Sequence, residues 1–211
     1  MTVDAAGDVS VSLLGGFAAA VGGVPVADKA WRLKKARELV KLLALAPSHR
    51  LHREQAMDLL WPDRAPAAAA NNLNQAVYVV RRALNGGAIA VRDESLHLNA
   101  DVDVDRLEQA AADARRTGTL AAYRGALELY GGELLPENRY DDWAASRRDE
   151  LTDLAAELAV GAALDSVDGA RPPPLPVVPD AEHEVRPGPR RAGQRPAHQV
   201  RVGRTSRGLH H

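Results

Sequence analysis

The hydrophobic pattern is clearest in residues 66–84, where apolar side chains recur at intervals of three and four residues. This spacing predicts an amphipathic helix whose buried stripe comprises Leu73, Val77, Val80 and Leu84. The opposite face has amide, phenol and guanidinium groups and no carboxylate; it comprises Asn71, Asn74, Gln75, Tyr78, Arg81 and Arg82. Amide and guanidinium groups can form two hydrogen bonds with one base edge in the major groove. The helix is therefore a candidate recognition helix for DNA, and a solvated helix face is the alternative.

Short runs typical of β-strands precede and follow the helical part. The runs before it are residues 9–14, 18–21 and 24–26. Paired glycines between these runs indicate tight turns, so they predict a small antiparallel sheet. After the candidate recognition helix, two glycines provide a stop, and residues 88–92 and 95–98 predict a β-hairpin.

Two more helices are predicted between the sheet and the candidate recognition helix. Residues 30–46 have an inward stripe formed by Ala36, Leu39, Val40 and Leu43. The same helix supplies most of the positive charge of this region, through Arg32, Lys34, Lys35, Arg37 and Lys41. Residues 51–61 predict a short helix with His52 at the cap, and Leu51 and Ala56 occupy the positions of a hydrophobic staple.

The order of sheet, three helices and hairpin is that of a winged helix-turn-helix. In that fold the third helix lies in the major groove, and the hairpin, or wing, reaches the neighbouring backbone or minor groove. This context favours DNA binding over a solvated helix face for residues 66–84.

Charge divides the chain into three parts, although the whole carries a net charge of only −1. Residues 1–100 have 12 Lys and Arg against 9 Asp and Glu, a net charge of +3. Residues 101–168 have 7 against 16, a net charge of −9, and residues 169–211 have 8 against 3, a net charge of +5. The mildly basic first part suits a DNA-contacting module, whereas the acidic second part is better suited to facing proteins.

Three motifs in this order resemble one family of regulators. They are LLWPD at the end of the second helix, ANNLNQAVYVVRRAL in the third, and YGGELLPENRYDDWA further along. Together with neighbouring segments they cover residues 9–158, about three quarters of the chain. On these motifs the chain resembles the Streptomyces antibiotic regulatory protein (SARP) family of transcriptional activators.

The resemblance implies a response-regulator-type winged helix, at residues 8–99, and the beginning of a bacterial transcriptional activation domain of tetratricopeptide-like helices, at residues 101–163. It implies that the protein binds directly repeated promoter sites, as a homodimer on double-stranded DNA, and contacts RNA polymerase. Carried over by position, the DNA-binding residues would be Asn71, Asn74, Gln75, Tyr78, Arg81 and Arg82, with Arg92 as the basic residue of the wing.

Three amphipathic helices are predicted in the acidic part, at residues 105–116, 119–130 and 139–160. Asp105 and Glu108 have the spacing of a capping box. The acidic run that begins at Asp101 lacks the glycine and glutamate that a calcium loop requires, so the structural explanation is preferred. Tyr140 and Trp143 are expected in the core, as aromatic residues at this spacing usually are.

The chain departs from the family at about Leu164. Residues 164–211 are rich in proline and arginine and have little apolar periodicity, so they predict a disordered tail and a truncated activation domain. A frameshift in a GC-rich gene would produce such a change of composition. In that case the chain would be a truncated, non-activating product.

Other classes of function have little support in the sequence. There is no cysteine and no phosphate-binding glycine motif, and the histidines lack the spacing of metal ligands, so we expect no enzyme activity, metal or cofactor. The start has no signal-peptide pattern and no apolar run is long enough to span a membrane, which predicts a cytoplasmic protein. The expected fold class is mainly α with small antiparallel β. The expected function is a DNA-binding transcriptional regulator, with a protein-interaction module as the alternative.

Overall fold

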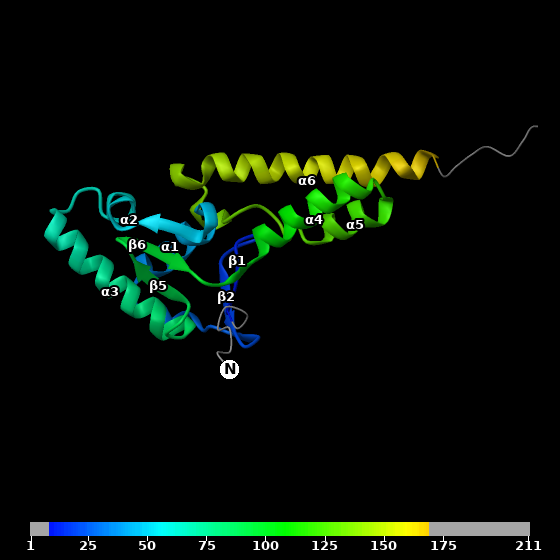
Figure 1. Ribbon diagram of the computed structural model, residues 1–211. Helices are drawn as coiled ribbons and strands as arrows, with labels where there is room; N and C mark the ends of the chain where they lie inside the picture. The colour runs from blue at the N-terminus through cyan, green and yellow to red at the C-terminus, as the bar shows by residue number, and fades with distance from the viewer. Residues whose placement is uncertain (1–8, 169–211) are drawn as a thin grey trace, which may run out of the picture. The chain divides into compact units, whose positions relative to one another are not determined.

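A computed structural model describes residues 9–168, with side chains to Ala163 (Figure 1). Its first sheet has the order β3-β2-β1-β7, and its strands are β1 (Val9–Ser12), β2 (Ala18–Val21), β3 (Val24–Pro25) and β7 (Asp101–Val102). The first three strands pair antiparallel, as expected from the glycine turns. The short strand β7 was not expected; it pairs parallel with β1, with Val11 opposite Val102.

Three helices follow the first sheet, namely α1 (Lys34–Leu45), α2 (Arg53–Leu60) and α3 (Pro66–Leu84). Single 3₁₀ turns at Asp28–Ala30 and Pro47–His49 precede and follow α1, which begins four residues later than expected. The predicted stripes of α1 and α3 are confirmed, because their members are buried in one hydrophobic core. His52 occupies the cap position of α2 as expected, and the structure adds a capping box: His52 Nδ1 accepts from Glu54 N, and Gln55 Oε1 accepts from His52 N.

The second sheet has the order β4-β6-β5. Its strands β5 (Ile89–Arg92) and β6 (Ser95–Leu98) form the expected hairpin, and β4 (Arg50–His52) adds a third strand that the sequence did not reveal. Asp93 and Glu94 turn the hairpin with φ angles of 46° and 54°. Two successive positive φ values define a type I′ turn, whose twist matches that of the two strands.

The acidic part contains α4 (Asp103–Thr117), α5 (Leu120–Glu128), a 3₁₀ turn at Pro136–Asn138, and α6 (Asp142–Asp168). Thr119 caps α5 by accepting a hydrogen bond from Ala122 N. The expected tail begins later than Leu164, because α6 continues to Asp168. The expectation of disorder beyond that point concerns residues 169–211, which lie outside the described part of the chain.

The segment between α5 and α6 joins the acidic part to the first sheet through its backbone. Leu14 and Leu134 form an antiparallel bridge, flanked by the hydrogen bonds from Gly15 N to Glu133 O and from Leu135 N to Leu13 O, each 2.9 Å long. Gly15 has a φ of 81°, and a Cβ there would lie 2.8 Å from Gly131 O. Only glycine therefore permits this close approach of the two backbones.

The capping box expected from Asp105 and Glu108 does not form at the start of α4. The helix begins at Asp103 rather than after Asp105, and Val102 at the cap position makes no side-chain hydrogen bond. Asp103 instead accepts from the backbone N–H groups of Leu13 and Leu14, at 2.9 to 3.0 Å. Burial raises the pKa of this carboxyl although these hydrogen bonds oppose the rise. Asp105 lies beside His49 instead, with 2.7 Å between Oδ2 and Nε2.

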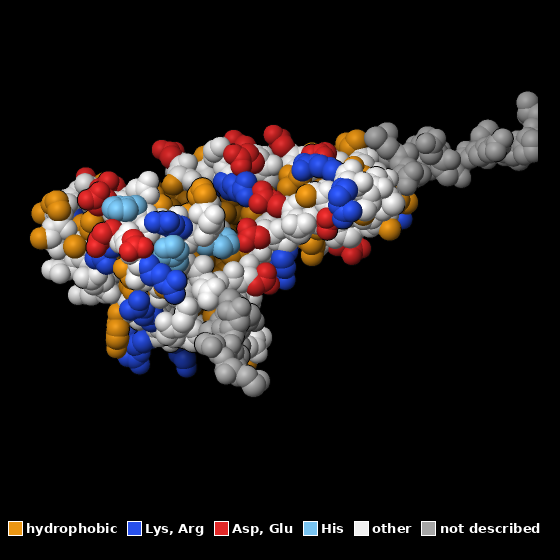
Figure 2. Space-filling view, viewed as in Figure 1, with side chains coloured by type: hydrophobic (Ala, Val, Ile, Leu, Met, Phe, Trp, Pro, Cys, Tyr) orange, Lys and Arg blue, Asp and Glu red, His pale blue; other side chains and the backbone are white. Residues whose placement is uncertain are grey.

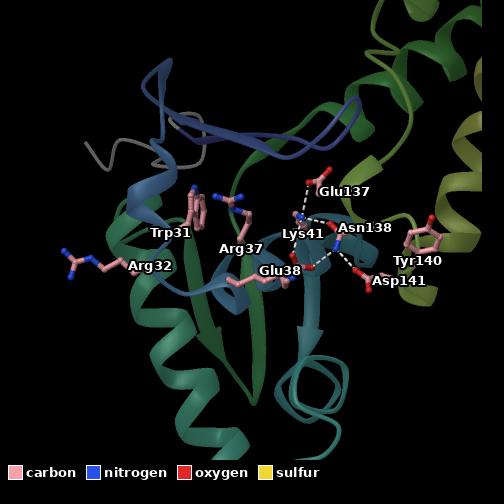
Figure 3. A pocket seen from close by; sticks show the side chains of 10 residues that line it. Trp31, Arg32, Arg37, Glu38, Lys41, Glu137, Asn138, Tyr140 and Asp141 are labelled. Atoms are coloured by element: carbon pink, nitrogen blue, oxygen red, sulfur yellow. Dashed lines mark hydrogen bonds and ion pairs between the residues drawn. The ribbon is translucent and has the colours of Figure 1, made fainter.

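Lys41 of α1 is only 1% exposed, although it belongs to the run of basic residues on that helix. Its ammonium group lies 3.3 Å from Glu38 Oε1 and 3.0 Å from Glu137 Oε1, and it also donates to Asn138 Oδ1 (Figure 3). Asn138 in turn donates to Glu38 Oε2 at 3.0 Å. A buried charge is tolerated when it is paired and hydrogen-bonded, and here the partners come from both α1 and the 136–138 turn.

Tyr140 was expected in the core, and this expectation is wrong. Its side chain is 93% exposed, because the chain turns at Pro136–Asn138 and α6 begins only at Asp142. The helical periodicity that would have placed Tyr140 inward therefore does not apply. Trp143, which lies within α6, packs against the core as expected.

We expect Asp103→Ala to lower the free energy of unfolding by about 1–3 kcal/mol, because buried backbone donors lose their acceptor. Asp105→Ala, in the same turn of α4, is the matched control and should cost less than about 1 kcal/mol, as the Asp105 side chain that contacts His49 is half exposed. Urea unfolding at pH 7 measures both effects. Equal losses would show that the Asp103 contact does not stabilise the fold.

The pH dependence of the free energy of unfolding should reveal the contribution of the Glu137 carboxylate to stability. Burial alone would raise its pKa, but hydrogen bonds from its own backbone, Lys41 and Phe17 hold the pKa below the ordinary value of 4.5. A lowered pKa contributes stability that is present above that ordinary value and is lost as the pH falls through the folded-state value.

Glu137→Gln should therefore be less stable than the wild type at pH 7, and the difference should narrow as the pH falls below about 4.5. Urea midpoints measured from pH 7 to pH 3 would show this narrowing. Glu128→Gln, at an exposed position of α5, is the charge-matched control. A gap between Glu137→Gln and the wild type that stays constant with pH would contradict the proposed ion pair.

Candidate nucleic-acid interface

The outer face of α3 is built as the sequence predicted. Its helix starts with Pro66 at the first position and spans the expected residues. The buried stripe anchors it in the core, so the opposite face is held outward by packing rather than by helix propensity alone. All six residues of that face are exposed, namely Asn71, Asn74, Gln75, Tyr78, Arg81 and Arg82.

Tyr78 and Arg82 form a pair near the C-terminal end of this face. Arg82 Nη1 lies 3.4 Å from the Tyr78 hydroxyl, and its guanidinium is 5.9 Å from the centre of the ring. The hydroxyl accepts this bond, and the remaining guanidinium N–H groups stay available to an outside acceptor. Tyr78 is 60% exposed, so the pair stands out from the surface.

Lys29 and Arg32 line a hollow together with Tyr78 and Arg82, and sequence reasoning did not assign them to the site. Lys29 lies in the turn Asp28–Ala30, and Arg32 follows it before α1 begins. Both are exposed. Arg32 was assigned to the helix expected at residues 30–46, and Lys29 was assigned to no element, so their tertiary contact with α3 could not be foreseen. The hollow brings three cationic side chains together beside Tyr78.

Arg81 has a second role besides its position on the outer face. Its Nε donates to the backbone oxygen of Ile89 at 3.2 Å, so the side chain joins α3 to strand β5 of the wing. Arg92, the expected basic residue of the wing, is exposed on β5. The tip next to it carries Asp93 and Glu94, so the wing ends in carboxylates and Arg92 is the part of it that suits a phosphate.

Arg53 connects α3 with the wing, and sequence reasoning missed it. Its Nη2 donates to Asn74 Oδ1 at 3.1 Å, and its Nε lies 3.5 Å from Glu94 Oε2. The backbone N–H of Arg53 also donates to Glu94 O at 2.9 Å. A basic residue at the start of α2 gives no sequence signal of such a contact, because its partners lie 21 and 41 residues further along the chain.

Charge is distributed unevenly over the surface. On the face shown in Figure 2, Lys and Arg side chains gather at the lower edge, near the C-terminal part of α3, whereas acidic side chains line the exposed side of α6. α3 itself has no Asp or Glu. A polyanion would therefore be attracted to the α3 side of the first domain and repelled by the helical part.

A second hollow is lined by Trp31, Lys41, Glu137 and Tyr140, among others (Figure 3). The buried charge within it is compensated by protein groups, because Lys41 and Asn138 bond to each other and to neighbouring carboxylates. Its polar groups therefore serve the packing of α1 against the 136–138 turn. Among the described residues, no group of three or more His, Asp or Glu side chains is arranged to hold a metal ion.

The fold is similar to that of EmbR from Mycobacterium tuberculosis, solved in complex with a low-affinity phosphopeptide. The match has a TM-score of 0.66 at 17% sequence identity and covers 78% of this chain and 47% of the EmbR chain. The chain thus spans about half the length of that protein, and the likeness at this identity is one of fold. No family model matches the sequence. No curated protein matches it either. Within residues 9–168, no helix has the length and apolar character of a membrane span.

Proposed function

We propose that this protein is a sequence-specific DNA-binding regulator of transcription that reads the major groove with α3. The observation that carries the proposal is the outer face of α3: six exposed amide, phenol and guanidinium side chains, without a carboxylate, on a helix anchored by its opposite stripe. The position of α3, after two helices and before a β-hairpin, is that of a recognition helix. The fold shared with EmbR, a SARP-type regulator, supports the same class.

The arrangement of side chains suggests a division of work along α3. Asn71, Asn74 and Gln75 lie in its N-terminal and middle turns, where recognition helices contact base edges. Their amides can pair with donor and acceptor groups of bases. Tyr78 and Arg82, together with the basic turn before α1, lie towards the other end and suit phosphate contacts, which position a protein on its duplex.

The helical part would then act on the transcription machinery. In the proposal it is the beginning of a tetratricopeptide-like activation domain, and two copies of the chain bind directly repeated sites side by side in the cytoplasm and contact RNA polymerase. The net charge of −9 on residues 101–168 would repel DNA, so DNA binding falls to the winged-helix part. The motif resemblance and the similarity of fold to EmbR support this assignment.

Arg82→Ala tests the phosphate contacts. The wild-type chain should bind duplex DNA with an affinity that falls steeply with salt, and the variant should bind all sequences more weakly, with a log–log salt slope shallower by about 0.9. Fluorescence anisotropy of labelled duplexes at several salt concentrations measures the slope. Arg116→Ala, which removes an exposed charge from α4, should leave it unchanged. A wild-type chain that is folded yet binds no duplex at low salt would refute the proposed function.

Gln75→Ala tests base reading. We expect it to cost about 1–3 kcal/mol of binding free energy on a selected site and little on unrelated duplexes, because a base contact contributes only where the base is present. Titrations of both kinds of duplex compare the two losses. Gln109→Ala, at an exposed position of α4, is the matched control. An equal loss on every sequence would reassign Gln75 to the DNA backbone.

A further inference from the structure

Asn74 is the residue of the outer face whose amide is already engaged by the protein. Its Oδ1 accepts from Arg53 Nη2 at 3.1 Å, and within the described residues its Nδ2 has no hydrogen-bond partner. Asn71 and Gln75, its neighbours on the same face, have no comparable contact among the described hydrogen bonds of α3. Asn74 therefore differs from the other amides in being oriented before any DNA arrives.

The orientation of this amide follows from the chemistry of its partner. A guanidinium has five N–H donors and no acceptor, so only the oxygen of the amide can face it. The amide nitrogen of Asn74 must then point to the other side, with both of its hydrogens available. The free face of Asn74 is consequently a donor.

Arg53 is held in place well enough to impose this orientation. Its side chain is only 21% exposed, and its Nε lies 3.5 Å from Oε2 of Glu94 at the wing tip. The backbone N–H of Arg53 also donates to the backbone oxygen of Glu94 at 2.9 Å. The guanidinium therefore meets Asn74 from one side and the wing from the other. A side chain fixed by two partners loses little further freedom when a ligand binds.

We propose that Arg53 is a positioning residue that makes Asn74 select guanine over adenine at one position of the operator. This inference rests on the proposed DNA-binding function and makes its base preference specific. An asparagine reads adenine with both groups, by donating to N7 and accepting from the N6 amino group. With Arg53 beside Oδ1, an amino group would approach a guanidinium that also carries only donors. Guanine presents O6 and N7, which are both acceptors, and suits the donor face that remains.

The preference depends on Arg53 rather than on Asn74 alone. If Arg53 is replaced by a residue without donors, Oδ1 no longer has a donor-only group beside it, and the amide can turn to the bidentate contact with adenine. Arg53→Met keeps an unbranched apolar stem in the partly buried position but has no donor. Arg53→Lys keeps a charged donor and should hold the amide in its original orientation.

The experiment is selection of a random duplex pool by the full chain, followed by sequencing of the bound DNA. Four proteins are compared, namely the wild type and the variants Asn74→Ala, Arg53→Met and Arg53→Lys, with Arg50→Ala as a matched control at an exposed site of β4. The position whose base preference disappears in Asn74→Ala is the position that Asn74 reads.

At that position we expect guanine to exceed adenine at least tenfold for the wild type, Arg53→Lys and Arg50→Ala, and adenine to rise to equal or exceed guanine for Arg53→Met. A general loss of folding or affinity would weaken selection at all positions and would not exchange one base for another. Adenine preferred by the wild type, or an unchanged preference in a folded Arg53→Met, would overturn the inference while the DNA-binding function stands. A wild-type chain that selects no sequence would overturn both.

Discussion

The buried ammonium of Lys41 constrains the rest of the structure most strongly. One charge, 1% exposed, is compensated within α1 by Glu38 and from the distant 136–138 turn by Glu137 and Asn138. Removing either carboxylate would leave this buried charge only partly compensated, which is more costly than losing an exposed ion pair. The turn is therefore bound to α1, and the backbone bridge between Leu14 and Leu134 extends the same contact to the first sheet. Since α1 also packs against α3, the helical part stabilises the element that carries the candidate DNA-binding face.

Regular periodicity made much of the fold predictable. The bounds of α3 agree with expectation. Pro66 suits the first helical turn, but Asn85, with a φ of 79°, follows the last turn in place of the expected glycine pair. The hairpin was evident from two β-type runs. The strands β4 and β7 were missed because two or three residues have no pattern of their own and become strands only beside β6 and β1. Lys41 and Tyr140 show the same limit, since burial depends on the partners that tertiary structure supplies.

The candidate site also combines features that the sequence pattern predicts with features that depend on tertiary contacts. An exposed face could be predicted from helical spacing, because an amphipathic helix that buries one stripe must present the other. The contacts of Arg53 with Asn74 and Glu94, and the approach of Lys29 and Arg32 to Tyr78, could not, because each joins residues far apart in the chain. What the structure adds is therefore the orientation of side chains whose positions were already known. For a protein that reads DNA this addition is substantial, since an amide turned by half a rotation presents a different pattern of donors and acceptors.

The proposed role of α3 is tested most directly by determining which surface of the protein lies on the DNA. The chain has no cysteine, so a single one can be introduced at Ala68, on the exposed N-terminal part of α3, or at Ala159, on the exposed side of α6, and coupled to an iron chelate that cuts nearby DNA. We expect strand cleavage at a defined place in a bound duplex from Ala68→Cys and none from Ala159→Cys. Cleavage from α6 without cleavage from α3, while both variants bind, would contradict the claim that α3 is the reading helix.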